Sequence, residues 1–165
     1  LDRYLKQALI TPHIIDEQVD LTNDKRFVNK FTKSVKSKRG AITKVLNYKG
    51  NELHDYMLKN YDLKTKHPNS FIIYIFEIPH SSAGGQVYGM NTDNALVFQE
   101  QSRKTTCLTH ELLHGLGLFH TFDNDGKYTF EKNKTDNIMD YPSKRYSIFA
   151  WQWQVIRKHK LVKTE

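Results

Sequence analysis

The apolar residues of this chain recur at spacings that change along the sequence, and each spacing predicts a particular element. In residues 27–35 they recur every four positions, which indicates a helix, and residues 53–61 show a second helical spacing. Residues 71–78 form a nearly unbroken apolar run of β-favouring types, so we expect a buried strand there, and residues 95–98 indicate another. Between them, the serines and glycines of residues 79–89 indicate a loop.

Two more helices are expected in the C-terminal half of the chain. One begins near Thr105, and the other spans residues 148–159, whose apolar positions have helical spacing. Helices and strands are therefore mixed along a chain that has no internal repeat and no linker composition. This order predicts an α+β fold in a single domain, residues 1–165.

Length and composition agree with a compact monomeric enzyme domain. A chain of 165 residues is long enough to bury a core, and no stretch approaches the ~18 consecutive apolar residues of a membrane helix. No charged-then-apolar signal peptide opens the sequence, and its first residue is Leu1, which suggests an excised or processed domain. Cys107 is the only cysteine, so no disulfide forms within the chain.

Candidate chemistry is concentrated in residues 110–120, which read HELLHGLGLFH. If the first part is helical, His110 and His114 lie one turn apart on the same face, and two imidazoles at that separation can bind one tetrahedral metal ion. Glu111 follows the first histidine directly, where its carboxylate can reach a metal-bound water without being a ligand.

The second part of the same segment supplies a turn and a third histidine. Gly117 is expected to end the helix, because glycine reaches left-handed backbone angles at little cost. The turn would return His120 to the first two histidines as a third ligand. The alternative is an amphipathic core helix whose histidines are satisfied by other partners.

The pattern H-E-x-x-H-x-x-G-x-x-H resembles the signature of the metzincin clan of zinc metallopeptidases. The resemblance implies one catalytic Zn²⁺ and a two-part domain. An upper subdomain of helices on a twisted mixed sheet would cover about residues 1–117, with the zinc helix at the floor of a cleft. A small lower subdomain, about residues 118–165, would carry a methionine turn and a closing helix.

Residues 137–141, Asn-Ile-Met-Asp-Tyr, resemble the methionine turn of that clan. Met139 would then lie beneath the metal, where a flexible thioether fills an irregular gap. Tyr141 stands where some metzincins carry a tyrosine that approaches the zinc. The resemblance implies either a further ligand or a hydrogen-bond donor to the transition state, and packing near the turn is the alternative.

The resemblance also implies that the strand before the zinc helix is a sheet edge that binds peptide substrate. That strand would contain Asn94, Ala95, Leu96 and Val97. An exposed edge offers unpaired backbone amides that an extended peptide can complete. An ordinary inner strand is the alternative.

Together these residues predict a zinc-dependent endopeptidase that acts on protein or peptide substrates. Glu111 would take the proton of the attacking water and pass it to the leaving nitrogen. A zinc-stabilised binding module without catalysis is a second hypothesis, although a retained Glu111 argues against it.

The C-terminal run from Asn137 to Pro142, followed by Trp151-Gln152-Trp153-Gln154, resembles bacterial metallopeptidase toxin domains. Such domains end secretion-system effectors and polymorphic toxins. The resemblance implies a secreted or delivered bacterial protein, and an inhibitor or immunity protein as a partner. A secreted stand-alone protease related to pappalysins is the alternative.

A basic stretch lies between Lys25 and Lys49, which holds nine Lys or Arg residues and no Asp or Glu. It is densest at Lys33, Lys36, Lys38 and Arg39. A solvated face explains it best, because the recognition motifs and aromatic platforms of nucleic-acid-binding proteins are missing. The competing function is a basic module that binds nucleic acid or an acidic protein.

Overall fold

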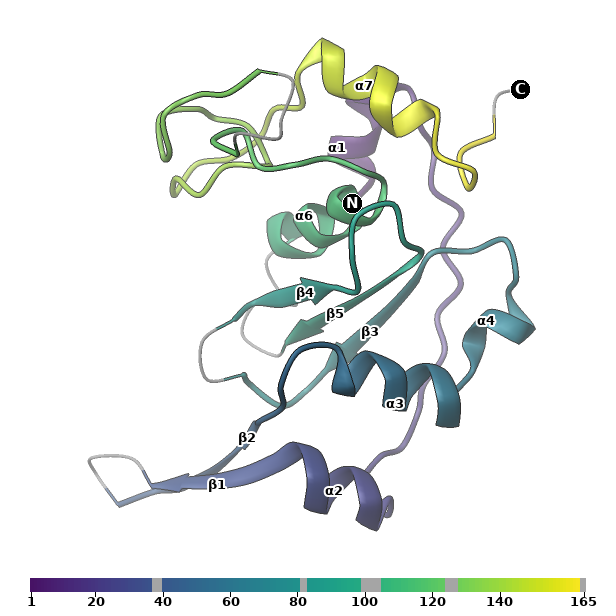
Figure 1. Cartoon of the computed structure of the whole chain (residues 1–165), viewed down its shortest axis with the longest axis vertical. Helices are drawn as coiled ribbons and strands as arrows, with labels where there is room; N and C mark the ends of the chain where they lie inside the picture. The colour runs from purple at the N-terminus through teal and green to yellow at the C-terminus, as the bar shows by residue number, and fades with distance from the viewer. Residues whose placement is uncertain (37–39, 81–82, 99–104, 124–127, 164–165) are drawn as a thin grey trace.

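Helices and two small sheets alternate along the chain in an α+β fold (Figure 1). The computed structural model describes residues 1–36, 40–80, 83–98, 105–123 and 128–163. The described elements, in chain order, are α1 (Asp2–Leu5), η1 (Lys6–Ala8), α2 (Lys25–Phe31), β1 (Thr32–Lys36), β2 (Ile42–Leu46), α3 (Glu52–Asn60), α4 (Leu63–Lys66), β3 (Ile72–Phe76), β4 (Gly85–Val87), β5 (Asn94–Phe98), α6 (Thr105–Gly115) and α7 (Ala150–Arg157).

The larger sheet has three strands in the order β3-β5-β4. β5 pairs with β3 in parallel and with β4 antiparallel. The expectation that residues 94–97 form a substrate-binding edge is therefore wrong, because β5 has a partner on each side. The edge on that side is β4, which lies within the predicted loop of residues 79–89 and has only three residues, too few to give a strand pattern.

The strands of this sheet sort their side chains onto two faces. Alternate residues of β3 point to opposite faces, as in any pleated strand. The buried ones, on the first face, are Ile72, Tyr74 and Phe76. The first face packs against α2 and α3 in a core that is rich in aromatic side chains. This α3-side core consists of Phe27, Phe31, Leu46, Leu53, Met57, Ile72, Tyr74, Phe76, Leu96 and Phe98.

The opposite face of the sheet is covered by α6, with the N- and C-terminal segments beyond it (Figure 1). This α6-side core consists of Tyr4, Leu5, Ala8, Leu112, Leu113, Leu116, Leu118, Ile138, Met139, Ile148 and Ile156. Residues from both ends of the chain meet in it. A division at residue 117 therefore does not separate the two cores.

Hydrogen bonds fasten the N-terminal turn to the C-terminal part. Gln7 donates to the carbonyl of Tyr146 (2.7 Å) and accepts from the amide of Ile148 (2.9 Å). The Arg157 side chain donates to the carbonyl of Ala8 (2.9 Å). The first ten residues thus help to hold the loops that surround the candidate site.

The helix predicted for residues 27–35 is half correct. α2 ends at Phe31, and Thr32 begins β1, which pairs with β2 in an antiparallel hairpin. The four-residue spacing continued to Val35, but cross-strand pairing with Thr43 places that residue in a strand. The other expected helices and strands are confirmed within a few residues by α3, β3, β5, α6 and α7.

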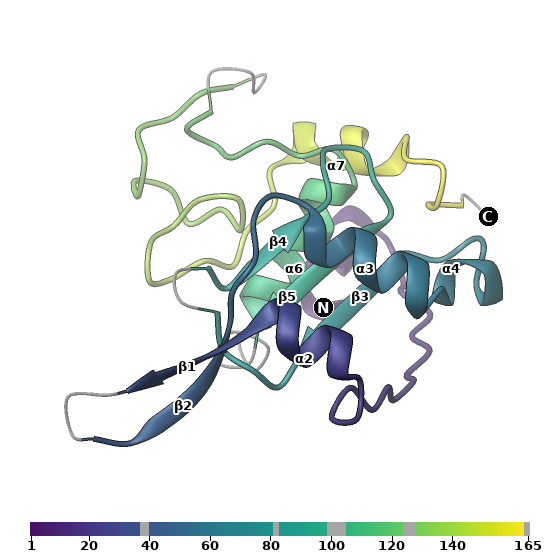
Figure 2. The same ribbon diagram turned by 60° about the horizontal axis from the view of Figure 1, so that its bottom comes forward.

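The β1–β2 hairpin carries much of the basic stretch away from the body of the molecule (Figure 2). Lys33 and Lys36 are exposed on it, whereas Lys38 and Arg39 lie outside the described residues. Within the part of the chain that the structure describes, no helix is both long and apolar enough to cross a membrane.

Asp24 joins the start of α2 to α3. Its carboxylate accepts from the backbone amide of Phe27 (3.0 Å) and from the hydroxyls of Tyr56 and Tyr61 (2.6 Å each). These bonds, with Tyr56 first, lower the pKa of Asp24 to about 2. Because the folded pKa is depressed, the stabilisation is complete above the ordinary value of 3.8 and is lost as pH falls toward 2.

We expect Asp24→Asn to lower the urea midpoint at pH 7, since asparagine can still cap the helix but offers the two phenols no charged acceptor. The difference from wild type should close between about pH 4 and pH 2. Asp2→Asn, which removes an exposed pair with Lys6, is the control and should change little. A difference that stays constant with pH would contradict this role of the Asp24 charge.

Candidate metal centre

α6 places the first two histidines of the segment on one face. His110 and His114 are separated by one turn of this helix, and both are buried. α6 lies directly against β4 and β5, so the sheet fixes its position. The predicted helix and the predicted pairing of these two histidines are therefore confirmed.

Gly117 ends the helical segment as predicted. Its φ of +99° lies in the region that favours glycine, and an added Cβ would lie 2.5 Å from Oδ1 of Asn91. The amide of Gly117 bonds to the carbonyl of His114 (2.9 Å), and the amide of Leu118 bonds to that of Leu113 (2.9 Å). This pair of bonds is the Schellman arrangement, and it directs the chain back toward His120.

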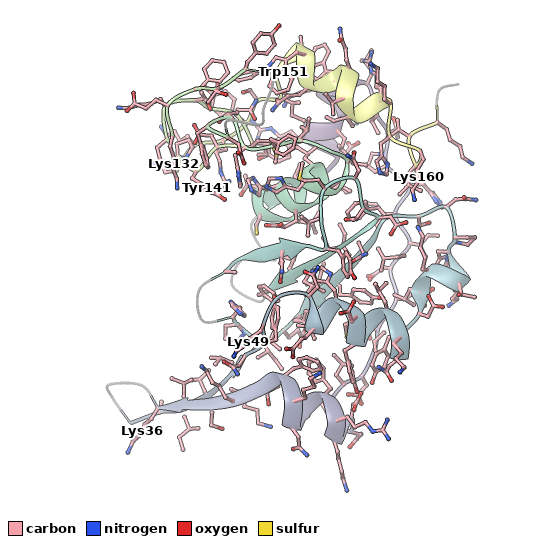
Figure 3. The ribbon with its side chains drawn as sticks, in the orientation of Figure 1. Lys36, Lys49, Lys132, Tyr141, Trp151 and Lys160 are labelled. Atoms are coloured by element: carbon pink, nitrogen blue, oxygen red, sulfur yellow. The ribbon has the colours of Figure 1, made fainter. Side chains whose placement is uncertain are left out.

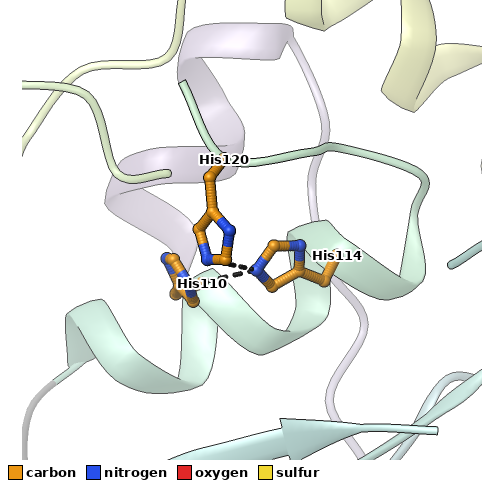
Figure 4. A group of neighbouring side chains, drawn as sticks. All are labelled: His110, His114 and His120. Carbon is orange, nitrogen blue, oxygen red and sulfur yellow. Dashed lines mark hydrogen bonds between the residues drawn. The ribbon is translucent and has the colours of Figure 1, made fainter. Parts of the chain in front are cut away.

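The three histidines converge on one point (Figure 4). Nε2 of His114 lies 3.1 Å from Nε2 of His110 and 3.1 Å from Nε2 of His120. One ligand atom from each residue lies within 4.8 Å of the others. Among the described residues, this is the group of His, Cys, Asp and Glu side chains that could hold a metal ion.

Hydrogen bonds at the other ring nitrogen orient two of these imidazoles. Nδ1 of His110 donates to the carbonyl of Ile138 (2.8 Å), and Nδ1 of His114 donates to that of Leu118 (2.7 Å). A carbonyl can only accept, so Nδ1 carries the proton and Nε2 presents its lone pair to the centre. Such partners hold histidine ligands in metal sites.

A zinc ion fits this donor set. Zinc–nitrogen bonds of 2.0–2.1 Å in a tetrahedron separate two ligand nitrogens by about 3.3–3.4 Å, close to the observed spacing. Lone pairs facing one another at 3.1 Å repel, and a shared cation removes that repulsion. A set of three imidazoles fills three tetrahedral positions and leaves the fourth open.

Burial keeps the ligands neutral. Desolvation, with the neighbouring histidines, lowers the pKa of His110 to about 3 and that of His114 to about 4. Desolvation also lowers the pKa of His120, although Asp123, 3.8 Å from its Nδ1, opposes the shift. All three rings are therefore uncharged at neutral pH, the form in which imidazole binds metals.

The side chain of Glu111 extends from α6 toward β4. An added Cβ on Gly85 would lie 2.6 Å from Cγ of Glu111, so only glycine lets the strand pass this close. Burial raises the pKa of the Glu111 carboxyl to about 7, while the backbone amide of Val87 and the charge of Arg145 lower it. A carboxyl of this kind can both take up and release a proton near neutral pH.

Met139 is completely buried in the α6-side core, as the methionine-turn prediction requires. Backbone bonds hold the turn against the histidines from two sides. The carbonyl of Ile138 binds His110, and the carbonyl of Met139 accepts from the amide of Thr121 (3.1 Å), the residue after His120. The turn therefore ties the helix ligand to the loop ligand.

Two polar groups that sequence reasoning did not assign hold this turn in shape. The buried Asn137 side chain accepts from the amide of Met139 (2.9 Å) and donates to Gln152 on α7 (2.8 Å). The Asp140 carboxylate accepts from the amides of Asn133, Thr135 and Tyr141. Gln152 stands at the N3 position of α7, where a glutamine often caps the start of a helix, so its buried polar role could have been predicted from the sequence. The contacts of Asp140 have no such pattern in the sequence.

Tyr141 reaches the site from this turn, although the residue is 46% exposed. Its hydroxyl lies within hydrogen-bond distance of Nε2 of His120, 2.7 Å away. The ring also lies beside those of His110 and Phe122. The predicted proximity of Tyr141 to the metal ligands is thus found, at the nitrogen that a metal would bind.

The strand residues predicted to bind substrate are not at the centre. Asn94 bonds instead to Nδ1 of His54 (2.7 Å) on α3, and Ala95, Leu96 and Val97 are fully buried inside the sheet.

No protein-family model matches the chain, and no curated protein or solved structure matches it. We therefore infer function from the geometry of the side chains.

We expect Gly117→Ala to destabilise the fold by roughly 1–3 kcal/mol, because alanine is strained at this φ and its Cβ would clash with Asn91. Zinc affinity should also fall, since the turn that returns His120 must shift. Calorimetric titration with zinc and urea unfolding measure the two effects.

Gly50→Ala is the matched control, because Gly50 also has a positive φ (+49°) but nothing lies within 4 Å of an added Cβ. It should cost stability alone and leave zinc affinity unchanged. Wild-type zinc binding by Gly117→Ala would show that the turn does not position His120.

Proposed function

We propose that this protein is a zinc-dependent endopeptidase of the metzincin type. The observation that carries the proposal is the convergence of three neutral imidazole nitrogens beside a buried carboxylate, Glu111. A bound zinc ion would supply a Lewis acid that polarises the scissile carbonyl and activates a water molecule.

Within this proposal, His110, His114 and His120 hold the metal, and Glu111 moves the proton. Glu111 accepts a proton from the attacking water and then donates it to the nitrogen of the leaving amine. Its burial supports this role, because a desolvated carboxylate takes up a proton more readily than an exposed one.

The free edge of β4 is where we place the backbone of an extended peptide. Gly84 and Tyr88 bond toward β5, so by antiparallel alternation the amide groups of Gly85 and Val87 face the other side. On that side the backbone amide of Val87 donates to the Glu111 carboxylate, so a peptide on this edge would pair with Gly85 and with the carbonyl of Val87. A peptide that adds to this edge would therefore lie beside the proton carrier.

The basic hairpin is given no role in this proposal. β1 and β2 lie at the end of the molecule opposite α7 and the loops around His120 (Figure 1).

We expect Glu111→Gln and Glu111→Ala to bind zinc with wild-type stoichiometry and to lose roughly 10²–10⁴-fold in peptide hydrolysis. Metal analysis and cleavage of a fluorogenic peptide library, with chelator inhibition, measure the two properties. Glu52→Gln, a change on α3 that breaks only an exposed pair with Lys30, should retain full activity. Full activity of either Glu111 variant would overturn the proposed mechanism.

The hydroxyl of Tyr141 is proposed to donate a hydrogen bond to the developing oxyanion. We expect Tyr141→Phe to lower kcat roughly 10- to 100-fold, with KM and zinc affinity unchanged. A large loss of zinc affinity instead would identify Tyr141 as a ligand. Unchanged kcat would show that its contact with His120 serves packing alone.

A further inference from the structure

Two cationic side chains flank the metal centre on the side of the C-terminal loops. Lys132 lies with its Nζ 4.9 Å from the ring centroid of Phe122 and 5.0 Å from that of Tyr141. Phe122 in turn stacks on His120, at 4.8 Å and an interplanar angle of 8°. The ammonium of Lys132 is therefore one aromatic ring away from the third histidine, and Figure 3 shows Lys132 next to Tyr141.

Arg145 approaches the centre from the other end of the same loop region. Its Nη1 donates to the carbonyl of Asp140 (2.8 Å), the residue before Tyr141, and the side chain is half-buried. Its positive charge acts on His110, Glu111 and Tyr141, since it lowers the pKa of each. Arg145 thus lies within electrostatic range of a helix ligand, the proton carrier and the tyrosine.

Neither cation has a carboxylate partner within the part of the chain that the structure describes. Among the described residues, no carboxylate oxygen lies within the 4.0 Å ion-pair distance of Lys132 or Arg145. Two nearby carboxylates have other partners: Asp123 faces Nδ1 of His120, and Asp140 is enclosed by three backbone amides. Neutral histidine ligands leave the charge of a bound metal ion uncancelled as well.

We propose that Lys132 and Arg145 select substrates with an Asp or Glu side chain next to the scissile bond. This inference rests on the proposed peptidase function and names its substrate class. A peptide backbone on the edge of β4 passes Glu111, and its side chains on the loop side meet the two cations. Arginine can bind a carboxylate through two parallel hydrogen bonds, and a lysine held over two rings contributes a fixed positive charge.

The test uses the zinc-loaded protein and fluorogenic peptides that differ at a single position. Each position within three residues of the cleaved bond is varied through Asp, Asn, Glu, Gln and Lys. We expect kcat/KM for the acidic peptide to exceed that of its amide isostere roughly tenfold at one position, and this ratio to shrink as salt is added.

Charge reversal identifies the residues responsible. Lys132→Glu should abolish the acidic preference and favour the Lys peptide at that position. Arg145→Gln, which can still donate to the carbonyl of Asp140, should reduce the preference without reversing it. Lys134→Glu is the matched control, because Lys134 is an exposed lysine of the same loop, 3.9 Å from Glu131, and should leave the preference unchanged. Zinc content and thermal unfolding establish that each variant is folded.

Failure of the inference is distinct from failure of the proposed function. Cleavage with equal kcat/KM for acidic and amide peptides would overturn the inference alone, as would an equal effect of Lys134→Glu and Lys132→Glu. No cleavage of any peptide by the zinc-loaded protein would overturn the proposed function and this inference with it.

Discussion

Three imidazole lone pairs face one another in a buried space, and the surrounding structure is arranged to keep them there. The inward lone pairs of His110 and His114, 3.1 Å apart, repel, so these two rings must be held from behind. The carbonyls of Ile138 and Leu118 hold two rings by accepting their Nδ1 protons. Burial adds to this constraint, because it lowers the pKa of the rings and prevents protonation from relieving the repulsion.

The two carbonyls that hold the histidine rings belong to different segments of the chain. Leu118 belongs to the turn after α6, and Ile138 belongs to the methionine turn. The methionine turn is in turn tied to α7 by the buried pair of Asn137 and Gln152, and α7 packs on the N-terminal residues. Removing one amide of a buried pair costs more than the hydrogen bond itself, because the remaining amide is left buried without a partner. The positions of His110 and His114 are thus coupled to how both termini pack.

Much of the fold and of the ligand set could be predicted from the sequence, because both depend on local spacing. The residues of HELLHGLGLFH lie in the last part of α6 and in the reversal that follows it, so local geometry alone brings the three histidines close together. Long apolar runs likewise predicted β3 and β5. The short strand β4 and the change from helix to strand at Thr32 were not predicted. Both depend on pairing with a neighbouring strand, which local spacing does not reveal.

The sequence by itself therefore determined the three histidines that converge, the glutamate next to the first of them and an α+β class. Only the tertiary structure decided which strand is the edge of the sheet, because edges depend on which strands find partners on both sides. It also decided that the charges of Lys132 and Arg145 act on the histidines. The charge of Arg145 acts on His110, which is distant along the chain, only after folding shortens the distance, since electrostatic energy depends on separation in space.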